Sequence, residues 1–243
     1  MRVETLSYND ASSKFTLTQL DRNLFSSPAW ISVLQKTYNI TLFVKYIERN
    51  GAVDSHIIYS VVKNFLEWKI CILSYCDYCD CPVKNKEDWK LFFEDLRREY
   101  PMFRIAVRNL RDEIVRESGC FSVLSQERFH FLDVREPVEV VWKKTHESFR
   151  SAVKQGQKAG VVVKRCDKTG LKKFFDLHLS LRKNKYRLFP QPYRFFENIW
   201  QEYIEKDQGV LLGAFDAGGN FIGGNVYLIC GNTLYYKFNT SSL

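Results

Sequence analysis

The stretch VLLGAFDAGGNFIGGNVYLICGNTLYYKF, residues 210–238, decides the fold class of this protein. Three runs rich in β-branched and aromatic residues (210–216, 221–230 and 233–238) are separated by two short polar segments. Those segments, Ala217–Asn220 and Gly231-Asn232, hold the glycine and asparagine residues that reverse a chain tightly. The stretch therefore predicts a meander of three antiparallel strands.

Helices and one further strand are predicted immediately before this meander. Residues 161–165 begin with three β-branched valines, which is typical of a strand, and Thr169 is expected to cap a helix that reaches Leu181. Another helix is predicted after Pro192. The order of one strand, two helices and three strands leaves the last strand as an open edge, which native proteins normally cover. We therefore expect this second domain to be incomplete after its fourth strand.

Charge is concentrated in one block of the chain. Residues 1–136 hold 19 basic and 19 acidic residues, whereas residues 137–187 hold 14 basic and 4 acidic ones. A predicted helical stretch opens this block at Pro137, breaks near His146 and ends at Gly160, a typical left-handed C-cap. One surface that meets phosphates or carboxylates is indicated, although a well-solvated helical face is an equally good interpretation.

The first 136 residues have the pattern of a mixed α/β domain. Helices are predicted after Ser27-Pro28 and after Asn85, because each pair of signals marks a helix start. The other predicted elements are strands at 41–48, 55–62, 68–73, 103–107 and 128–134, and a short helix at 110–117.

The composition places the chain among globular proteins. Of its 243 residues, 45% are apolar and 26% are charged, which excludes the disordered and fibrous classes. No run approaches the roughly 18 apolar residues of a membrane span, and residues 1–10 are too polar for a signal peptide. The 7 cysteines, without a signal sequence, favour reduced thiols. We expect a cytoplasmic protein without a transmembrane segment.

Five segments resemble the FemAB-like acyltransferases, and they occur in that family's order. SFRSAVKQGQKAGVVV (148–163) resembles "R…I-K-K-A-x-K-x-G-v-x-V", and LHLSLRKNKYRLFPQPYRFF (177–196) resembles "L-H-x-x-T-R-x-K-x-G-x-P-x-Q-P-x-x-F-F". LYYKFNTSS (234–242) is similar to "Y-Y-K-Y-x-A-S". In the N-terminal half, FSSPAWISVL (25–34) and LSYCDYCDCPV (73–83) are similar to "F-x-S-P-x-W" and "S-D-Y-C-D-P".

This resemblance implies a fold and an activity. The family includes acetyltransferase-like proteins found with cellulose and exopolysaccharide biosynthesis, and its α/β fold is a pair of GNAT-type domains. It implies tandem GNAT-like domains at residues 1–136 and 137–243, the second truncated. The implied enzyme is an N-acyltransferase that moves an acetyl or aminoacyl group to an amine of a cell-envelope or exopolysaccharide precursor, a sugar or a peptide. Acyl-CoA (acetyl-CoA) or aminoacyl-tRNA is the implied donor, and no metal is expected.

The sequence also departs from the family pattern. The phosphate-cradling GNAT loop, R/Q-x-x-G-x-G/A, follows the fourth strand, a position that lies beyond Leu243 in the second domain. The corresponding loop of the first domain, Ser74–Pro82, contains no glycine. Peptidoglycan-building members place a phosphate-contacting lysine four residues after the tryptophan that matches Trp30, and this chain has Leu34 there. A nucleotide-linked muropeptide acceptor therefore loses support.

The loop Cys76-Asp77-Tyr78-Cys79-Asp80-Cys81 is the densest candidate for catalysis. Its cysteine spacings resemble those of zinc sites, but no histidine or second cysteine pair lies nearby to complete four ligands. The resemblance implies an acceptor-pocket loop, with Asp77 or Asp80 as general base and Tyr78 as a positioning group. Alternatively, the aspartates cap backbone amides and the thiols pack as small apolar groups.

The basic block supplies candidate binding residues. Arg150, Lys154 and Lys158 fall at i, i+4 and i+8 on one helical ridge, which suits a polyphosphate or an RNA backbone, and we predict that they bind the donor. Arg182 matches the arginine of the family's "T-R" pair, and a guanidinium can hold a phosphate or carboxylate in a bidentate pair. Gln191 matches the glutamine of "P-x-Q-P".

The last predicted strand adds two substrate-binding candidates. Alternation places Tyr235 and Lys237 on one face and Tyr236 on the other, and Lys237 could neutralise an acidic substrate. We predict that Arg182, Gln191, Tyr236 and Lys237 bind the substrate. A helix-terminal charge, a turn residue and an edge-strand lysine are the structural alternatives for Arg182, Gln191 and Lys237.

The sequence also bears on functions other than acyl transfer. No Ser/His/Asp set, nucleotide P-loop or Rossmann fingerprint is present, so hydrolases and kinases have no support. The second hypothesis is a non-catalytic module that binds tRNA or another anionic ligand, or an inactive shortened transferase. Steeply salt-dependent RNA binding would favour such a module. DNA is not an expected partner, whereas peripheral membrane contact and pairing through the exposed last strand are further expectations.

Overall fold

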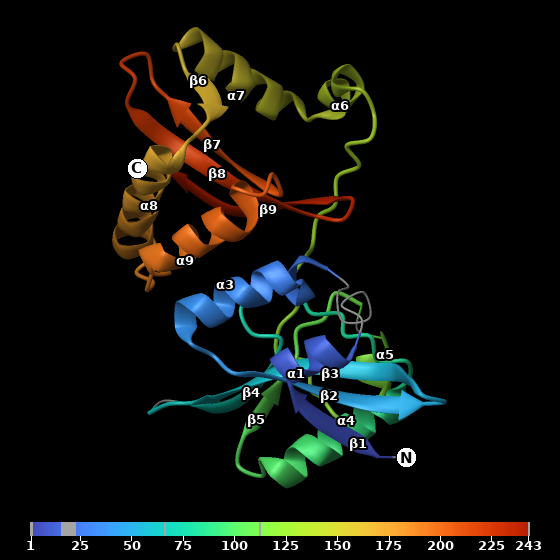
Figure 1. The fold of residues 1–243 in the computed structure, drawn as a ribbon. Coiled ribbons are helices and arrows are strands. Elements are labelled where there is room, and N and C mark those ends of the chain that lie inside the picture. Colours follow the sequence, from blue (N-terminus) through green and yellow to red (C-terminus); the bar gives the residue numbers. More distant parts are fainter. Residues whose placement is uncertain (1, 16–22, 66, 112, 243) are drawn as a thin grey trace. The chain divides into compact units, whose positions relative to one another are not determined.

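A computed structural model describes residues 2–15, 23–65, 67–111 and 113–242 of the chain. The chain divides into two compact units, Met1–Gln126 and Glu127–Leu243, and each unit is built around one sheet (Figure 1). The domain boundary predicted after residue 136 lies inside the second unit and stays a proposal. No helix in the described ranges is long and apolar enough to cross a membrane.

The first unit contains a five-stranded sheet in the order β1-β2-β3-β4-β5. Neighbouring strands are antiparallel except β4 and β5, which are parallel. Its elements are β1 (Val3–Ser7), α1 (Tyr8–Lys14), η1 (Leu24–Ser26), α3 (Pro28–Tyr38), β2 (Leu42–Arg49), β3 (Ala52–Lys63), β4 (Trp68–Ile72), α4 (Lys86–Glu99), β5 (Arg104–Ala106) and α5 (Glu113–Glu117).

Local sequence signals explain where two of these helices begin. The hydroxyl of Ser27 accepts the backbone N–H of Trp30 at 3.3 Å, and Pro28 occupies the first turn of α3. The side chain of Asn85 accepts the N–H of Asp88 at 2.9 Å at the start of α4. Both helix starts predicted from the sequence are confirmed.

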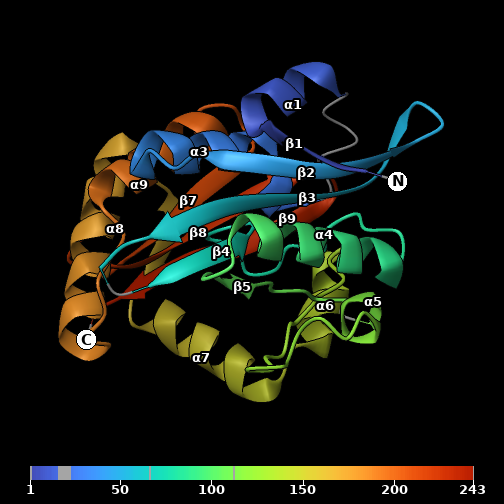
Figure 2. The ribbon, with the colours of Figure 1, turned by 90° about the horizontal axis from the view of Figure 1, so that it is seen from below.

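Helices cover both faces of the first sheet, as the alternation of β2 shows. The Lys45 ammonium lies 2.7 Å from a carboxylate oxygen of Asp95 and 2.8 Å from one of Glu99, both on α4. The next side chain points to the opposite face, where the Tyr46 hydroxyl accepts a hydrogen bond from Lys14 of α1 at 2.8 Å. The sheet therefore lies between α4 and α1, as Figure 2 shows.

The second unit contains an antiparallel sheet in the order β6-β7-β8-β9. The predicted meander and both of its turns are confirmed. Its elements are α6 (Val138–Lys144), α7 (Glu147–Lys158), β6 (Val162–Arg165), α8 (Lys168–Ser180), the π-helical turn η2 (Leu181–Lys185), α9 (Tyr193–Ile199), the π-helical turn η3 (Trp200–Ile204), β7 (Gly209–Phe215), β8 (Phe221–Cys230) and β9 (Thr233–Ser241).

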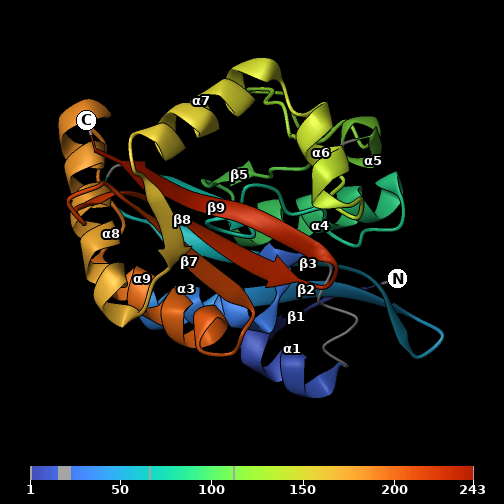
Figure 3. The same cartoon turned by 90° about the horizontal axis from the view of Figure 1, so that it is seen from above.

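Aromatic side chains attach α8 and α9 to this sheet. Phe174 of α8 and Phe196 of α9 are fully buried, with ring centroids 5.6 Å apart. Phe238 of β9 lies edge-on to Phe196 at 5.3 Å and to Phe195 at 5.6 Å. Figure 3 shows α7 apart from the α8 and α9 pair, and no residue of α7 is buried. The core of this unit therefore lies between the sheet and α8 and α9.

Two sequence-based predictions about elements need correction, and two elements lie outside the predictions. The predicted strand at 128–134 is irregular and its side chains are exposed, because an apolar alternation forms a strand only where a neighbouring strand pairs with it. β1 and α1 were not predicted, although β1 pairs with β2 along its length. The cap of α8 is Asp167 rather than Thr169, since its carboxylate accepts the N–H of Thr169 and of Gly170 at 3.0 Å each.

Candidate functional site

The loop predicted to carry the catalytic residues is fixed by backbone contacts in the first unit. One carboxylate oxygen of Asp80 accepts the N–H of Leu110 at 2.8 Å and that of Arg111 at 3.0 Å. The N–H of Cys79 donates to the carbonyl of Arg108 at 2.7 Å. The loop is thereby attached to the segment that follows β5. These contacts match the capping role that we weighed for the aspartates, and a role of Asp80 as general base stays a prediction.

The thiols of this loop are packing groups. Cys76 and Cys79 are buried, and their thiols donate to the carbonyls of Leu73 and Arg108 at 2.7 and 3.0 Å. The hydrogen bond with Cys79, together with burial, raises the pKa of the Cys76 thiol. A protonated thiol is a poor nucleophile and a poor metal ligand. Among the described residues, no group of three or more His, Cys, Asp or Glu side chains is arranged to hold a metal ion.

The other two predicted catalytic residues differ in accessibility. Asp77 is exposed, whereas Tyr78 is buried with its ring edge-on to Phe25 at 5.4 Å. Asp77 is therefore the carboxylate of this loop that solvent or a substrate reaches most easily. Neither role is tested by the geometry of the loop, and both stay predictions.

Backbone strain marks the same loop. Leu73, Tyr75 and Asp80 have φ values of 53°, 57° and 30°, a left-handed region that non-glycine residues rarely adopt. Such strain persists where surrounding contacts fix it, and it gathers at functional sites. Tyr75 lies in this strained segment and is 53% exposed. Its ring stacks parallel to that of Tyr38, with the ring centroids 4.5 Å apart. Sequence reasoning missed this ring pair, because no residue pattern reports a left-handed backbone.

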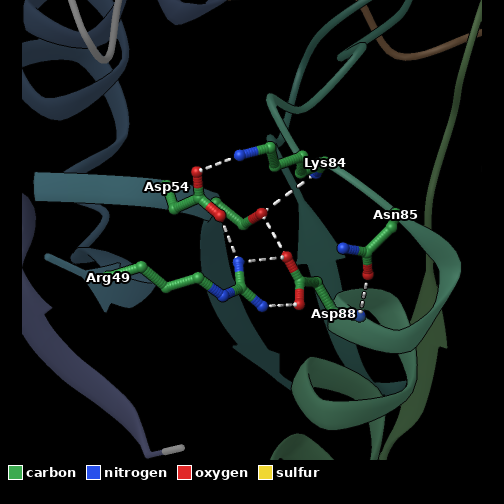
Figure 4. A network of polar contacts seen from close by, with 6 residues as sticks. Arg49, Asp54, Lys84, Asn85 and Asp88 are labelled. Atoms are coloured by element: carbon green, nitrogen blue, oxygen red, sulfur yellow. Dashed lines mark hydrogen bonds and ion pairs between the residues drawn. The ribbon is translucent and has the colours of Figure 1, made fainter.

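A charged network next to this loop was also missed. Asp88 is fully buried, and its carboxylate accepts two hydrogen bonds from Arg49, at 2.5 and 3.0 Å (Figure 4). Ser55 donates to the same carboxylate at 2.5 Å and accepts the N–H of Lys84 at 2.9 Å. Asp54 pairs with both Arg49 and Lys84. The network ties the β2–β3 hairpin to the start of α4 and is structural.

In the second unit, the structure brings two predicted substrate-binding residues to one buried histidine. Nε2 of His178 on α8 lies 3.2 Å from Oε1 of Gln191, and Arg182 follows one turn later in η2. Burial lowers the pKa of His178, and the neighbouring Arg182 charge acts in the same direction. Nε of Arg182 is buried without a hydrogen-bond partner among the described residues. Buried polar groups usually have a hydrogen-bond partner, so this donor is unusual in the unit.

The edge strand β9 carries the other two predicted residues. Val226 of β8 pairs with Phe238 and Tyr227 pairs with Tyr236, so Lys237 is an extra residue that forms a β-bulge. The bulge returns Phe238 to the core face, whereas strict alternation would place it with Tyr236 on the opposite one. Tyr236 is 57% exposed and its ring lies 5.5 Å from Tyr227. Within the described part of the chain, the outer side of β9 pairs with no strand.

The predicted basic ridge lies on α7 as expected. Lys154 and Lys158 are exposed and form no ion pair with any described residue. Arg150 is half-buried, and its guanidinium donates to the carbonyl of Lys143 at 3.0 Å. The ridge is therefore a solvated cationic surface, and its role in donor binding stays a prediction.

Comparisons with known proteins assign this arrangement to a family. The profile of the acetyltransferase (GNAT) domain family matches residues 143–242, from the end of α6 through β9. The second half of the chain therefore carries a GNAT-type domain, in agreement with the predicted family. The fold resembles the crystal structure of FemX with a TM-score of 0.65 and 14% identity, over 100% of this chain and 81% of that one. No curated protein sequence matches this chain.

A second solved structure is a weaker match. An acetyltransferase of the GNAT family from Staphylococcus aureus Mu50 aligns with 34% of this chain and 53% of its own, at 16% identity and a TM-score of 0.31. The likeness to FemX supports the predicted tandem GNAT-like architecture, and the family match makes the second half an acyltransferase domain. That match includes Arg150, Arg182, Gln191 and Lys237, whereas the 76–81 loop lies outside it.

Proposed function

We propose that this FemAB-like protein is an N-acyltransferase that takes its acyl group from acyl-CoA and delivers it to an amine of a cell-envelope or exopolysaccharide precursor. The observation that carries the proposal is the open edge of β9 with its bulge at Lys237. GNAT-type folds bind the donor by letting its pantetheine arm pair like an inserted strand. An edge strand offers the free N–H and C=O groups that such pairing requires.

The bulge would direct backbone groups of β9 toward the reacting atoms. A bulge interrupts the regular ladder and re-aims backbone groups, and bulges are common beside active sites. Backbone N–H groups held beside the thioester would stabilise the oxyanion that develops when the amine attacks the carbonyl carbon. The amide bond forms as the C–S bond breaks, and the thiolate leaves and is protonated. Positioning of the two reactants supplies much of the rate in such a transfer.

The basic residues that follow α8 fit the donor's phosphates. Arg182 has a buried Nε without a partner, and Lys183, Lys185 and Arg187 are exposed in the residues that follow. The ring of His178 lies beside the backbone of Asn239 on β9, so the start of this basic segment is attached to the edge strand. Guanidinium and ammonium groups bind phosphates, and this basic segment is our candidate for contacts with the donor's phosphates.

The bulge allows a test that separates backbone geometry from charge. Deleting Lys237 would restore the regular pairing of Tyr236 with Tyr227 and of Phe238 with Val226, so the core contacts of Phe238 should survive. K237A keeps the bulge and removes the charge. We expect calorimetry to show saturable acetyl-CoA binding by the wild-type protein and by K237A, and at least about tenfold weaker binding by the deletion variant.

Transfer is then measured as release of free CoA in the presence of glucosamine or a lysine-containing peptide. Absence of acetyl-CoA binding by the wild-type protein, or equal binding by the deletion variant, would refute the proposed donor site. Titration of bulk tRNA, followed by charged tRNA, at low and physiological salt tests the alternative donor. Salt-sensitive tRNA binding without acetyl-CoA binding would favour an aminoacyl donor, or the non-catalytic module if charged tRNA gives no transfer.

A further inference from the structure

A continuous part of the second unit, from α6 to β6, exposes apolar and basic side chains together. No residue of α6, α7 or β6 is buried. The segment 137–165 contains seven basic residues and two acidic ones. A surface helix of a globular protein normally buries its apolar stripe, so this segment departs from the usual pattern.

The apolar side chains are large and accessible. Phe149 and Val153, one turn apart on α7, are 68% and 45% exposed. Val138 on α6 is 78% exposed, and Val162 and Val163 of β6 are 57% and 61% exposed. Exposed apolar side chains that gather in one segment and have polar neighbours mark interaction sites.

The basic side chains lie beside these apolar ones. On α7, Lys154 follows Val153 directly, and Arg150 follows Phe149, so a cationic row runs next to the apolar row. Lys154 and Lys158 form no ion pair with any residue that the structure describes. A helix with an apolar face and lysine or arginine on its polar side is typical of helices that lie in the membrane interface.

The positive charges of this surface indicate an anionic partner. We infer that α7, with its neighbours α6 and β6, docks on an anionic phospholipid surface, with Phe149 and Val153 inserted between the headgroups and Lys154 and Lys158 on the lipid phosphates. RNA would satisfy the lysines but would leave the aliphatic and aromatic side chains in water. A lipid interface satisfies both sets at once, because acyl chains meet the apolar row and anionic headgroups meet the cations.

The fold supports such docking at the end of α7. Gly160, which follows the C-cap of α7, has a φ of +75°, and a Cβ there would lie 3.1 Å from the Cβ of Ala217. This close approach anchors the C-terminal end of α7 against the β7–β8 turn, so the exposed rows have a fixed direction. The inference gives Lys154 and Lys158 a partner other than the acyl donor expected from the sequence, and it does not rest on the edge of β9.

Sedimentation with lipid vesicles tests this inference. The full chain is mixed with vesicles of phosphatidylglycerol and phosphatidylcholine in equal parts, or of phosphatidylcholine alone, at low and physiological salt. We expect sedimentation with the anionic vesicles only. K154E/K158E should reduce the bound fraction at least about tenfold, because each cation contributes separately to binding an anionic surface. F149S/V153S should bind at low salt and be lost at physiological salt, where attraction between charges is screened.

Matched controls make the result interpretable. Lys86 and Lys90 are exposed at the same i, i+4 spacing on α4, so K86E/K90E changes the net charge equally and should bind as the wild-type protein does. Circular dichroism confirms that each variant is folded, which is expected because none of these side chains is buried. Absence of wild-type binding to anionic vesicles, equal loss in K86E/K90E, or binding to bulk tRNA without binding to vesicles would overturn the inference.

Discussion

Nε2 of His178 lies 3.2 Å from Oε1 of Gln191, and this contact joins α8 to the loop before α9. The sequence suggested both Arg182 and Gln191 as substrate ligands but gave no reason to connect them. His178 makes the connection, because its ring is buried against Phe174 and Phe196 and lies beside the backbone of β9. Helix, loop and edge strand thus meet at one imidazole, and four predictions begin from this and similar contacts.

The stability of the protein should depend on the protonation of His178. Burial lowers its pKa in the folded state below the ordinary value of 6.5; the Gln191 contact opposes this shift, and the neighbouring Arg182 charge adds to it. The unfolded chain therefore binds the proton more readily, and the free energy of unfolding falls as the pH drops below about 6.5 towards the folded pKa. Urea unfolding of the wild-type protein and of H178N at pH 7.5 and 5.5 measures this. The variant should show a smaller pH dependence, and an unchanged dependence would contradict the prediction.

Asp80 should matter for stability more than Asp77 does. D80A removes one acceptor of two backbone N–H groups, from Leu110 and Arg111, and should lower the free energy of unfolding by about 1–3 kcal/mol. D77N is the matched control, because Asp77 is exposed, and it should change stability by less than about 0.5 kcal/mol. Urea titrations of both variants provide the comparison. If D77N instead abolishes acyl transfer while leaving the fold intact, its predicted role as general base is supported.

The Arg49–Asp88 pair should be among the costliest to break in the first unit. Asp88 is fully buried, and D88A would leave Arg49 without its bidentate partner and Ser55 without its acceptor. We expect a loss of about 1–3 kcal/mol, because the buried Ser55 hydroxyl loses its acceptor while Arg49 is 30% exposed and keeps its pair with Asp54. D54A, at the more exposed end of the same network, should cost clearly less than D88A. Chemical denaturation that ranks the two variants equally would show that burial does not control this network.

The aromatic stack of Tyr75 on Tyr38 should be worth little to the fold. Tyr75 is about half exposed and its backbone is strained, so Y75G relieves the strain while removing the ring. We expect the free energy of unfolding to change by less than about 1 kcal/mol, because the two effects oppose each other. Thermal unfolding measures the change, and Y75A, which removes the ring but keeps the strain, should be the less stable variant.

Sequence patterns predicted most of the helices and strands, but not which extended segments pair with one another in the sheets. The starts of α3 and α4 follow from Ser27 and Asn85, because helix capping depends on residues that are neighbours in the chain. The strand predicted at 128–134 failed and β1 was missed, because pairing with β2 rather than local alternation decides which extended segment joins the sheet.

The candidate site was likewise predicted from the sequence only in part. The family resemblance led to Arg182, Gln191 and Lys237, and the match to a GNAT domain supports the region that holds them. The bulge at Lys237 was invisible in the sequence, because it is a property of the register between two strands. The fully buried Asp88 was equally hidden, since Arg49 is distant in the chain.

The sequence by itself determined the class of the fold, the starts of α3 and α4 and the concentration of positive charge, all of which depend on residue type and local spacing. Only the tertiary structure decided which face Phe238 takes, that Asp80 caps the segment after β5, and that the apolar row of α7 stays exposed. The physical reason is the distance along the chain over which each kind of interaction acts. Capping and periodicity act within a few residues, whereas burial and strand register depend on contacts between segments far apart in the chain.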